Sequence, residues 1–284
     1  MENEKKTKQK FIDRNPILCA LLFAVLGLTL MQAGAFAINA PIPLVFPAYP
    51  ADCGPVGVVL MGALTLYLYK RHYRPEYAGC IAGADYSHVW ALVIAYGVFL
   101  VFTLAHGFMS GAKMAVPTLR SFSLALFAGV TEEAAFRGLM VPTLTRRRTR
   151  QSLMQAIWIP AVVFGLVHGF NGLAGANAGA TVLQVVNAVA IGVVFCLLFL
   201  LSGNILIPMA LHFAHDLIAF TFVESVNADG IMTAGVTLSD MLDFGAVLIL
   251  CGFALWYFLR SDRPDAALRV WQRKWTIAEK TTAA

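Results

Sequence analysis

The chain has 284 residues, of which 59% are hydrophobic and only 13% are charged, and its mean hydropathy is +0.71. A water-soluble domain carries about 25% charged residues, so this composition excludes a soluble globular protein and a disordered one. Apolar segments recur along the whole chain and are long rather than alternating, which also excludes a soluble domain behind a signal peptide and a membrane β-barrel. The composition therefore predicts an all-α polytopic membrane protein.

A membrane-spanning helix needs about 20 mostly apolar residues, and eight segments approach this length. In chain order they are residues 16–38, 54–69, 88–109, 119–141, 153–170, 181–202, 205–223 and 240–260. Only Gly203-Asn204 separates the sixth segment from the seventh, which predicts a tight helical hairpin with a glycine cap. We therefore expect about eight transmembrane helices.

The basic residues gather on one side of this arrangement. Most of the 21 Lys and Arg residues lie in the N-terminal tail, in the loops after the second and fourth spans, and in the C-terminal tail, whereas the alternate loops have only Lys113 and, at a helix edge, Arg120. Positively charged loops remain in the cytoplasm, so both termini are predicted to be cytoplasmic, as eight spans also require. The net charge of +5 is thus explained by orientation in the cell membrane and indicates no nucleic-acid partner. Trp271 and Trp275, with basic residues between them, predict a short segment on the cytoplasmic membrane surface.

The fourth span holds charges at membrane depth, where each costs at least a few kcal/mol and marks function by default. Glu133 and Arg137 are four residues apart, so they share a helix face and can pair. Glu132 points about 100° away and is available to a partner on another helix. A Glu–Arg pair that only fixes packing remains an alternative, but it does not explain the second carboxylate. A general base at Glu132 does explain it.

Two later spans supply matching groups. The fifth span contains His168, and Gly165 begins a small-residue face that allows another helix to come close, as a contact between Glu132 and His168 requires. In the seventh span, His212 and Asp216 lie one turn apart and share a face. We expect these three spans to meet within the membrane.

Several chemistries use such a set of groups. Glutamate with histidine activates water for peptide hydrolysis, and histidine with aspartate stabilises an oxyanion. The same groups bind divalent metals or relay protons in a transporter.

Three motifs, each on a predicted span, narrow this choice. They are Glu-Glu-x-x-x-Arg (Glu132, Glu133, Arg137), Phe-x-x-x-His (Phe164, His168) and His-x-x-x-Asp (His212, Asp216). In this order they resemble the motifs of the CPBP intramembrane proteases, which include type II CAAX prenyl endopeptidases and bacteriocin-immunity (Abi) proteins. The resemblance covers about residues 119–223, a protease-like core. It is preceded by a tail and three spans (1–118) and followed by one span and a basic tail (224–284).

The resemblance implies an intramembrane endopeptidase of eight helices whose active site opens towards the cytoplasm. It implies that Glu132 is the general base and that His168 helps to hold and activate the water molecule. It also implies that Glu133, held by Arg137, supports the site.

By the same resemblance, His212 and Asp216 form the oxyanion hole, and Phe164 shapes the pocket. Many relatives have Asn at the position of Asp216. An ionised aspartate cannot donate a hydrogen bond to an oxyanion, so Asp216 either is protonated or acts by orienting His212.

The implied substrate is a membrane protein or a lipid-modified peptide, for example a prenylated CAAX-type protein, taken from the bilayer. The glutamate mechanism requires no cofactor, whereas a divalent metal such as zinc on Glu132, His168 and His212 is the alternative. A proton-coupled transporter and a non-catalytic immunity or scaffold protein are the other hypotheses. The lack of interior charges in the first three spans weighs against the transporter.

Overall fold

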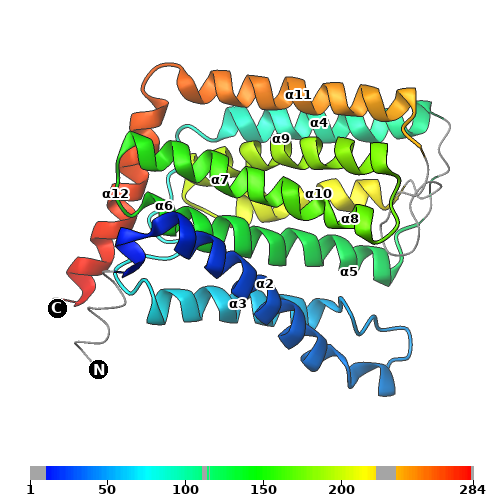
Figure 1. Cartoon of the computed structure of the whole chain (residues 1–284), viewed down its shortest axis with the longest axis horizontal. Helices are drawn as coiled ribbons and strands as arrows, with labels where there is room; N and C mark the ends of the chain where they lie inside the picture. The colour runs from blue at the N-terminus through cyan, green and yellow to red at the C-terminus, as the bar shows by residue number, and fades with distance from the viewer. Residues whose placement is uncertain (1–10, 111–113, 115, 222–234, 283–284) are drawn as a thin grey trace.

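The computed structural model describes residues 11–110, 114, 116–221 and 235–282. Within these ranges the chain is helical and contains no strand, which confirms the predicted all-α class. Most helices run along one direction and pack side by side, and α12 (Arg263–Thr282) lies across one end of them (Figure 1). The apolar side chains of the fourth to seventh predicted spans form much of the buried core.

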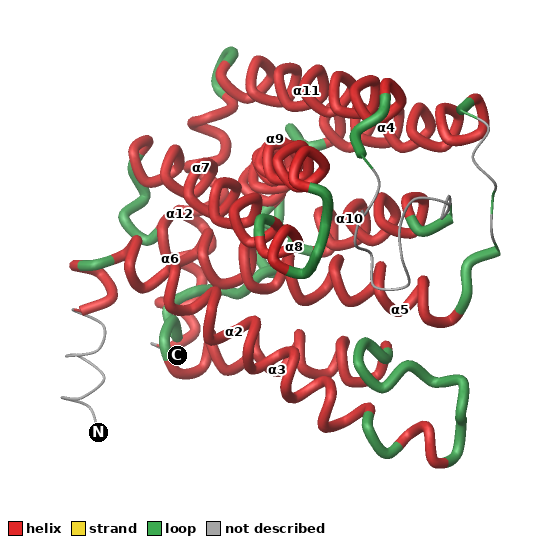
Figure 2. The backbone as a smooth tube through the Cα atoms, turned by 45° about the vertical axis from the view of Figure 1, so that its right-hand side comes forward, coloured by secondary structure: helices red, strands yellow, loops and turns green. Residues whose placement is uncertain are grey.

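The first two spans form a pair at one edge of the bundle (Figures 1 and 2). α2 (Pro16–Asn39) and α3 (Pro55–His72) both begin with proline, whose fixed φ and missing N–H suit the first turn of a helix. The Asn39 side chain ties them together, because its amide donates to the Gly54 carbonyl at 2.8 Å and its oxygen accepts from Gly57 N at 2.9 Å.

The opposite edge is formed by α4 (Trp90–Met109) and α11 (Leu238–Leu259), which lie side by side in Figures 1 and 2. Between the two edges lie α7 (Arg150–His168), α9 (Ala178–Ser202) and α10 (Leu206–Ala219). α9 is the central helix, because its second half is buried without interruption. Gly203 ends it in the left-handed conformation at φ 65°, which confirms the predicted glycine cap.

The small-residue face of α7 meets α9 rather than the fourth span. A Cβ atom at Gly165 would lie 2.7 Å from the carbonyl oxygen of Val185, so only glycine permits this approach. The expected close approach therefore occurs, but with a different helix. It positions α7 and α9 around the buried charges described below.

The fourth predicted span consists of α5 (Leu119–Phe127), η2 (Ala128–Glu132), η3 (Ala134–Met140) and α6 (Val141–Thr145). η2 and η3 are wide, π-helical turns, which often occur at functional sites. Pro142 has no N–H to bond the carbonyl of Gly138, and the Cys80 thiol approaches that carbonyl instead, at 3.8 Å. The candidate carboxylates thus lie on the irregular part of this segment.

In the described part of the chain, each of the eight predicted apolar segments contains a helix, but only five described helices have the length and apolarity of a membrane span. They are α2 continued through η1 (Ile42–Leu44), α4, α7 continued through α8 (Phe170–Leu173), α9 and α11. α10 has 14 residues, and α3 ends in three basic residues, Lys70, Arg71 and His72. The protein is an integral membrane protein of several apolar helices, while the eight-span topology and the placement of both termini remain predictions.

The C-terminal segment differs from the short surface element expected from its tryptophans. α12 is a full helix, and Trp271 and Trp275 are buried against the protein. The Trp271 indole donates to the Leu200 carbonyl at 3.1 Å, and the Tyr77 ring stacks on Trp271 at 6.0 Å. Packing against the end of α9 and the loop after α3 therefore determines where these aromatic side chains lie.

Candidate active site

Glu133 and Arg137 form the predicted pair. The Arg137 Nη1 donates to Glu133 Oε1 at 2.8 Å, and both side chains are fully buried. The second guanidinium nitrogen, Nη2, donates to the carbonyl of Gly192 on α9 at 3.2 Å. The rings of Phe164 and Phe195 flank the guanidinium, with centroids 4.7 and 5.4 Å from it. Arginine thus joins the fourth predicted span to both α7 and α9.

His212 brings α10 into the same cluster. Its Nδ1 lies 2.9 Å from the same carboxylate oxygen of Glu133 that Arg137 binds. An arginine-paired carboxylate is ionised and can only accept, so the His212 Nδ1–H donates to it. This bond fixes the orientation of the imidazole and directs Nε2 to the other side.

Two further carboxylates face that second nitrogen of His212. Glu132 Oε2 lies 3.8 Å from it, and Asp216 Oδ2 lies 3.6 Å from it. Glu132 is 25% exposed and Asp216 is 23% exposed, whereas His212 is 7% exposed. The carboxylates of Glu132 and Asp216 are therefore partly accessible, and both lie near the Nε2 atom of a nearly buried imidazole.

The predicted contact between Glu132 and His168 is not formed. Among the described residues no hydrogen bond or ion pair joins them; the His168 Nδ1 lies 2.8 Å from the Phe164 carbonyl of its own helix. Because a carbonyl only accepts, the Nδ1–H donates to it and Nε2 is left free. The Phe164 ring packs edge-on against His168 at 4.7 Å and against His212 at 5.9 Å. The Phe164 ring therefore contacts the rings of both histidines.

Two buried polar atoms of this cluster have no hydrogen-bond partner among the described residues, namely Glu133 Oε2 and Arg137 Nε. An unpaired buried polar atom costs about 1–3 kcal/mol, so the cluster is not arranged for stability alone. This agrees with the prediction that a packing pair is an incomplete explanation of the segment.

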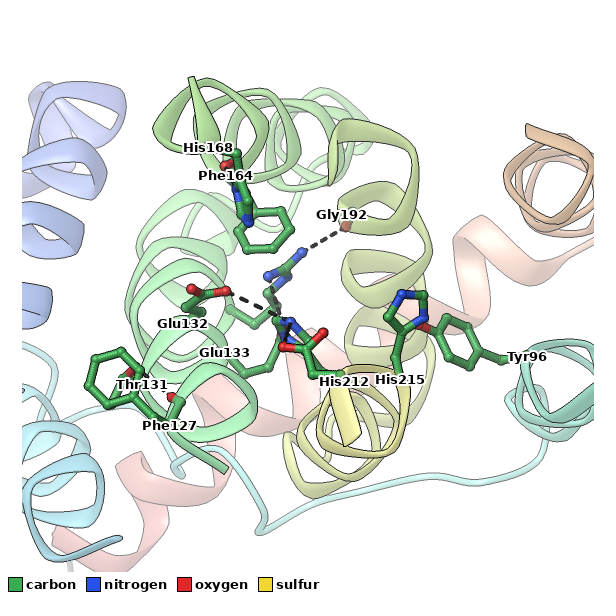
Figure 3. A network of polar contacts seen from close by, with 12 residues as sticks. Tyr96, Phe127, Thr131, Glu132, Glu133, Phe164, His168, Gly192, His212 and His215 are labelled. Atoms are coloured by element: carbon green, nitrogen blue, oxygen red, sulfur yellow. Dashed lines mark hydrogen bonds and ion pairs between the residues drawn. The ribbon is translucent and has the colours of Figure 1, made fainter. Parts of the chain in front are cut away.

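The cluster includes groups that the sequence did not indicate. Gly192 and Phe195 on α9 contribute a carbonyl and a ring, but no pattern in the sequence distinguishes them from their apolar neighbours. His215, which lies within the His-x-x-x-Asp motif directly before Asp216, points away from the carboxylates (Figure 3). Its Nδ1 is bonded to the Tyr96 hydroxyl of α4 at 3.2 Å, and the Phe99 ring stacks on it.

The arrangement places a base, an oriented imidazole and a second acid within one partly accessible cluster. Such a set can remove a proton from water and hold a developing negative charge. The imidazoles of both His168 and His212 have their Nδ1 bound to an acceptor, which is also usual for metal ligands. Within the described residues, however, no group of three or more His, Cys, Asp or Glu side chains is disposed to hold a metal ion.

Comparison with known protein families identifies the same segment. Residues 114–218 match the family model described as type II CAAX prenyl endopeptidase Rce1-like. The match covers more than a third of the chain and contains every residue of the three motifs. No curated protein and no solved structure matches the chain. Residues 114–218, which contain the whole buried cluster, are therefore similar to the type II CAAX prenyl endopeptidases of the Rce1-like family.

Proposed function

We propose that the protein is an intramembrane endopeptidase in which Glu132 activates water for hydrolysis of a peptide bond. The observation that carries this proposal is the convergence of Glu132 and Asp216 on His212, which Glu133 orients from behind. The family match supports an endopeptidase of the CAAX type. It does not bear on the catalytic mechanism, which rests on the geometry alone.

In this mechanism Glu132 takes a proton from a water molecule that the free Nε2 of His168 helps to hold. The hydroxide attacks the carbonyl carbon of the scissile bond, and the resulting oxyanion accepts a hydrogen bond from the Nε2–H of doubly protonated His212. Glu133 accepts from Nδ1 throughout and stabilises the imidazolium. The proton on Glu132 then passes to the leaving amine, which completes the hydrolysis.

The role of Asp216 in this mechanism depends on its protonation state. When protonated it donates a second hydrogen bond to the oxyanion, and when ionised it orients and stabilises His212. The substitution of Asp216 considered in the Discussion distinguishes these two roles.

The proposed substrate is a membrane-associated protein or peptide cut near its C-terminus, including prenylated CAAX-type proteins. The basic loops support access of this substrate from the cytoplasmic side of the cell membrane. The partly exposed Glu132 and Asp216 are consistent with a site that a peptide enters from the membrane–water boundary.

A divalent metal is the alternative to a glutamate-activated water. Glu132, His168 and His212 are suitable ligand types, and an ion there would polarise the scissile carbonyl. We nevertheless favour the glutamate mechanism, because among the described residues no group of three or more His, Cys, Asp or Glu side chains is disposed to hold a metal ion. A chelator distinguishes the two, since glutamate-dependent cleavage is expected to be unaffected by it.

The test uses purified full-length protein in liposomes with a farnesylated CAAX peptide and the same peptide without its lipid. Mass spectrometry of the products reports the cleaved bond. We expect cleavage by the wild type and a loss of at least about a hundredfold in Glu132→Gln and in His168→Ala. The matched control is Asp52→Asn, which alters an exposed ion pair with Arg120 and is expected to retain activity.

Normal turnover by Glu132→Gln would refute the mechanism, whereas the absence of cleavage by the wild type on either peptide would refute the proposed substrate. Loss of activity in chelator, with recovery on addition of zinc, would favour the metal alternative.

A further inference from the structure

A second group of chemically active side chains lies at the ends of α4 and α11. His106 is in the last turn of α4, and Ser239 and Asp243 are one turn apart at the start of α11. The His106 Nδ1 lies 2.8 Å from Asp243 Oδ1, and its Nε2 lies 3.4 Å from Ser239 Oγ. In Figure 1 these helix ends meet at the end of the bundle opposite α12.

These contacts run from a carboxylate to an imidazole to a hydroxyl, which is the arrangement around an activated serine nucleophile. A carboxylate that accepts from Nδ1–H fixes the imidazole tautomer, and Nε2 then offers its lone pair to the serine hydroxyl. The 3.4 Å contact is of the length found for such pairs before a substrate is bound. The Phe102 ring lies parallel to His106 at 5.6 Å and holds the plane of the imidazole.

The position of Ser239 supplies a place for developing negative charge. α11 has 22 residues, and Thr237 caps it by accepting from Asp240 N. The N–H groups of Leu238 and Ser239 belong to the first turn, where the helix provides no acceptor for them. Such N–H groups stabilise anions, and they lie on the same residue as the hydroxyl or on its neighbour.

The surroundings indicate what kind of molecule reaches this group. Asp243 is 40% exposed and Ser239 is half-buried, so the group is accessible. Large apolar side chains are exposed around it, at Met109, Leu238 and Leu242. An apolar rim at the end of a membrane helix favours a substrate with a hydrocarbon chain.

The group is independent of the cluster around His212. His106 is ten residues beyond Tyr96 on α4, the residue that bonds His215, which corresponds to about 15 Å along the helix. Among the residues that the structure describes, no hydrogen bond or ion pair joins it to the carboxylates of the fourth predicted span, and none of its members lies in the segment that matches the protease family.

We propose that Ser239, His106 and Asp243 form a second nucleophilic site, which acts on carboxylic esters with a long acyl chain at the membrane surface. Ser239 Oγ bonds to the ester carbonyl carbon as its proton passes to His106 Nε2, and the alcohol leaves with that proton. A water molecule deprotonated by His106 then cleaves the acyl-serine. The products are the free carboxylic acid and the regenerated hydroxyl.

The first experiment treats the purified full-length protein with a fluorescent alkyl fluorophosphonate. Ser239 Oγ bonds to phosphorus, fluoride leaves, and the proton passes to His106. We expect labelling of the wild type at Ser239, found by peptide mass spectrometry, and no labelling there in Ser239→Ala. Ser239 in His106→Gln and in Asp243→Asn is expected to be labelled at least about a hundredfold more slowly than in the wild type. The control Ser110→Ala, which removes an exposed hydroxyl beyond the end of α4, is expected to label as the wild type does.

An unlabelled Ser239 in the folded wild type would overturn the proposal. Labelling of Asp243→Asn at the wild-type rate would also overturn it, because the contacts would then only join α4 to α11. This variant is nearly isosteric, and its thermal unfolding verifies that it is folded. A second experiment measures hydrolysis of a long-chain nitrophenyl ester. Its loss in Ser239→Ala supports the site, and its absence in a wild type labelled at Ser239 overturns the assignment to esters.

Discussion

Two of the described regions that bury charge differ in the partners of their charged groups. In the cluster around His212, carboxylates, an arginine and an imidazole face one another, and one carboxylate oxygen of Glu133 has no hydrogen-bond partner among the described residues. At the end of the bundle, Lys274 of α12 is also buried, but its ammonium donates to the carbonyls of Gly79 and Ala82, both at 2.8 Å. The rings of Tyr77 and Trp271 flank it.

The comparison separates two uses of a buried charge. Around Lys274 the charge is bound by carbonyls and aromatic faces, which cannot exchange protons, so the group fastens α12 to the loop after α3. Around His212 the neighbours are themselves acids and bases that keep free lone pairs, so protons can move among them. Burial alone therefore does not indicate chemistry, whereas burial among titratable groups with unpaired atoms does.

The largest effect on stability is expected from breaking the ion pair in the His212 cluster. Arg137→Met leaves Glu133 buried without its cation, which costs about 3–5 kcal/mol. The control Arg120→Met breaks an exposed pair with Asp52, for which about 1 kcal/mol or less is expected. Thermal unfolding of both variants in the same detergent measures the difference, and equal destabilisation would contradict the importance of the buried pair.

The next largest effect concerns the role of Asp216 in the proposed hydrolysis. If Asp216 donates to the oxyanion, Asp216→Ala lowers the cleavage rate by about 10²–10³-fold, whereas Asp216→Asn, whose amide donates, retains most of it. If Asp216 acts through its negative charge on His212, the Asn variant is impaired nearly as much as the Ala variant. Rates on the farnesylated peptide distinguish these two outcomes.

A smaller effect is expected where α7 packs on α9 behind the cluster. Gly165→Ala places a methyl group 2.7 Å from the Val185 carbonyl, which forces the helices apart at about 1–3 kcal/mol. Gly97→Ala on α4 meets no atom within 4 Å and is expected to be neutral or stabilising, because alanine favours the helix. A Gly165→Ala protein as stable as the Gly97→Ala protein would show that α7 and α9 accommodate the added methyl group without loss of stability.

The smallest effect is a dependence of stability on pH at Lys274. Burial lowers the pKa of this ammonium from its usual 10.5 to about 8. The folded state thus releases a proton before the unfolded state does, so stability is lower below about pH 8 and rises as the pH increases from about 8 to about 10.5. We expect the unfolding temperature of the wild type, relative to that of Lys274→Met, to rise by a few degrees over this window. A constant difference between the two proteins would contradict the lowered pKa of Lys274 in the folded state.

The sequence by itself determined which segments are apolar helices and which residues of the fourth predicted span could pair. Low charge content and long apolar runs decide the first, because the bilayer requires them. The four-residue spacing of Glu133 and Arg137 decides the second, because a helix turn brings such residues together. The three motifs also sufficed to predict the similarity to CAAX-type intramembrane proteases that the family match finds over residues 114–218.

The tertiary structure alone decided which groups from different helices meet. Spacing along one helix gave no reason for His212 to bind Glu133, or for His168 to bond its own helix carbonyl instead of Glu132. Nor did it indicate that His106 lies between Ser239 and Asp243, more than 130 residues away in the chain. Such contacts depend on the order in which helices pack and on where glycine lets them approach, and one-dimensional periodicity records neither.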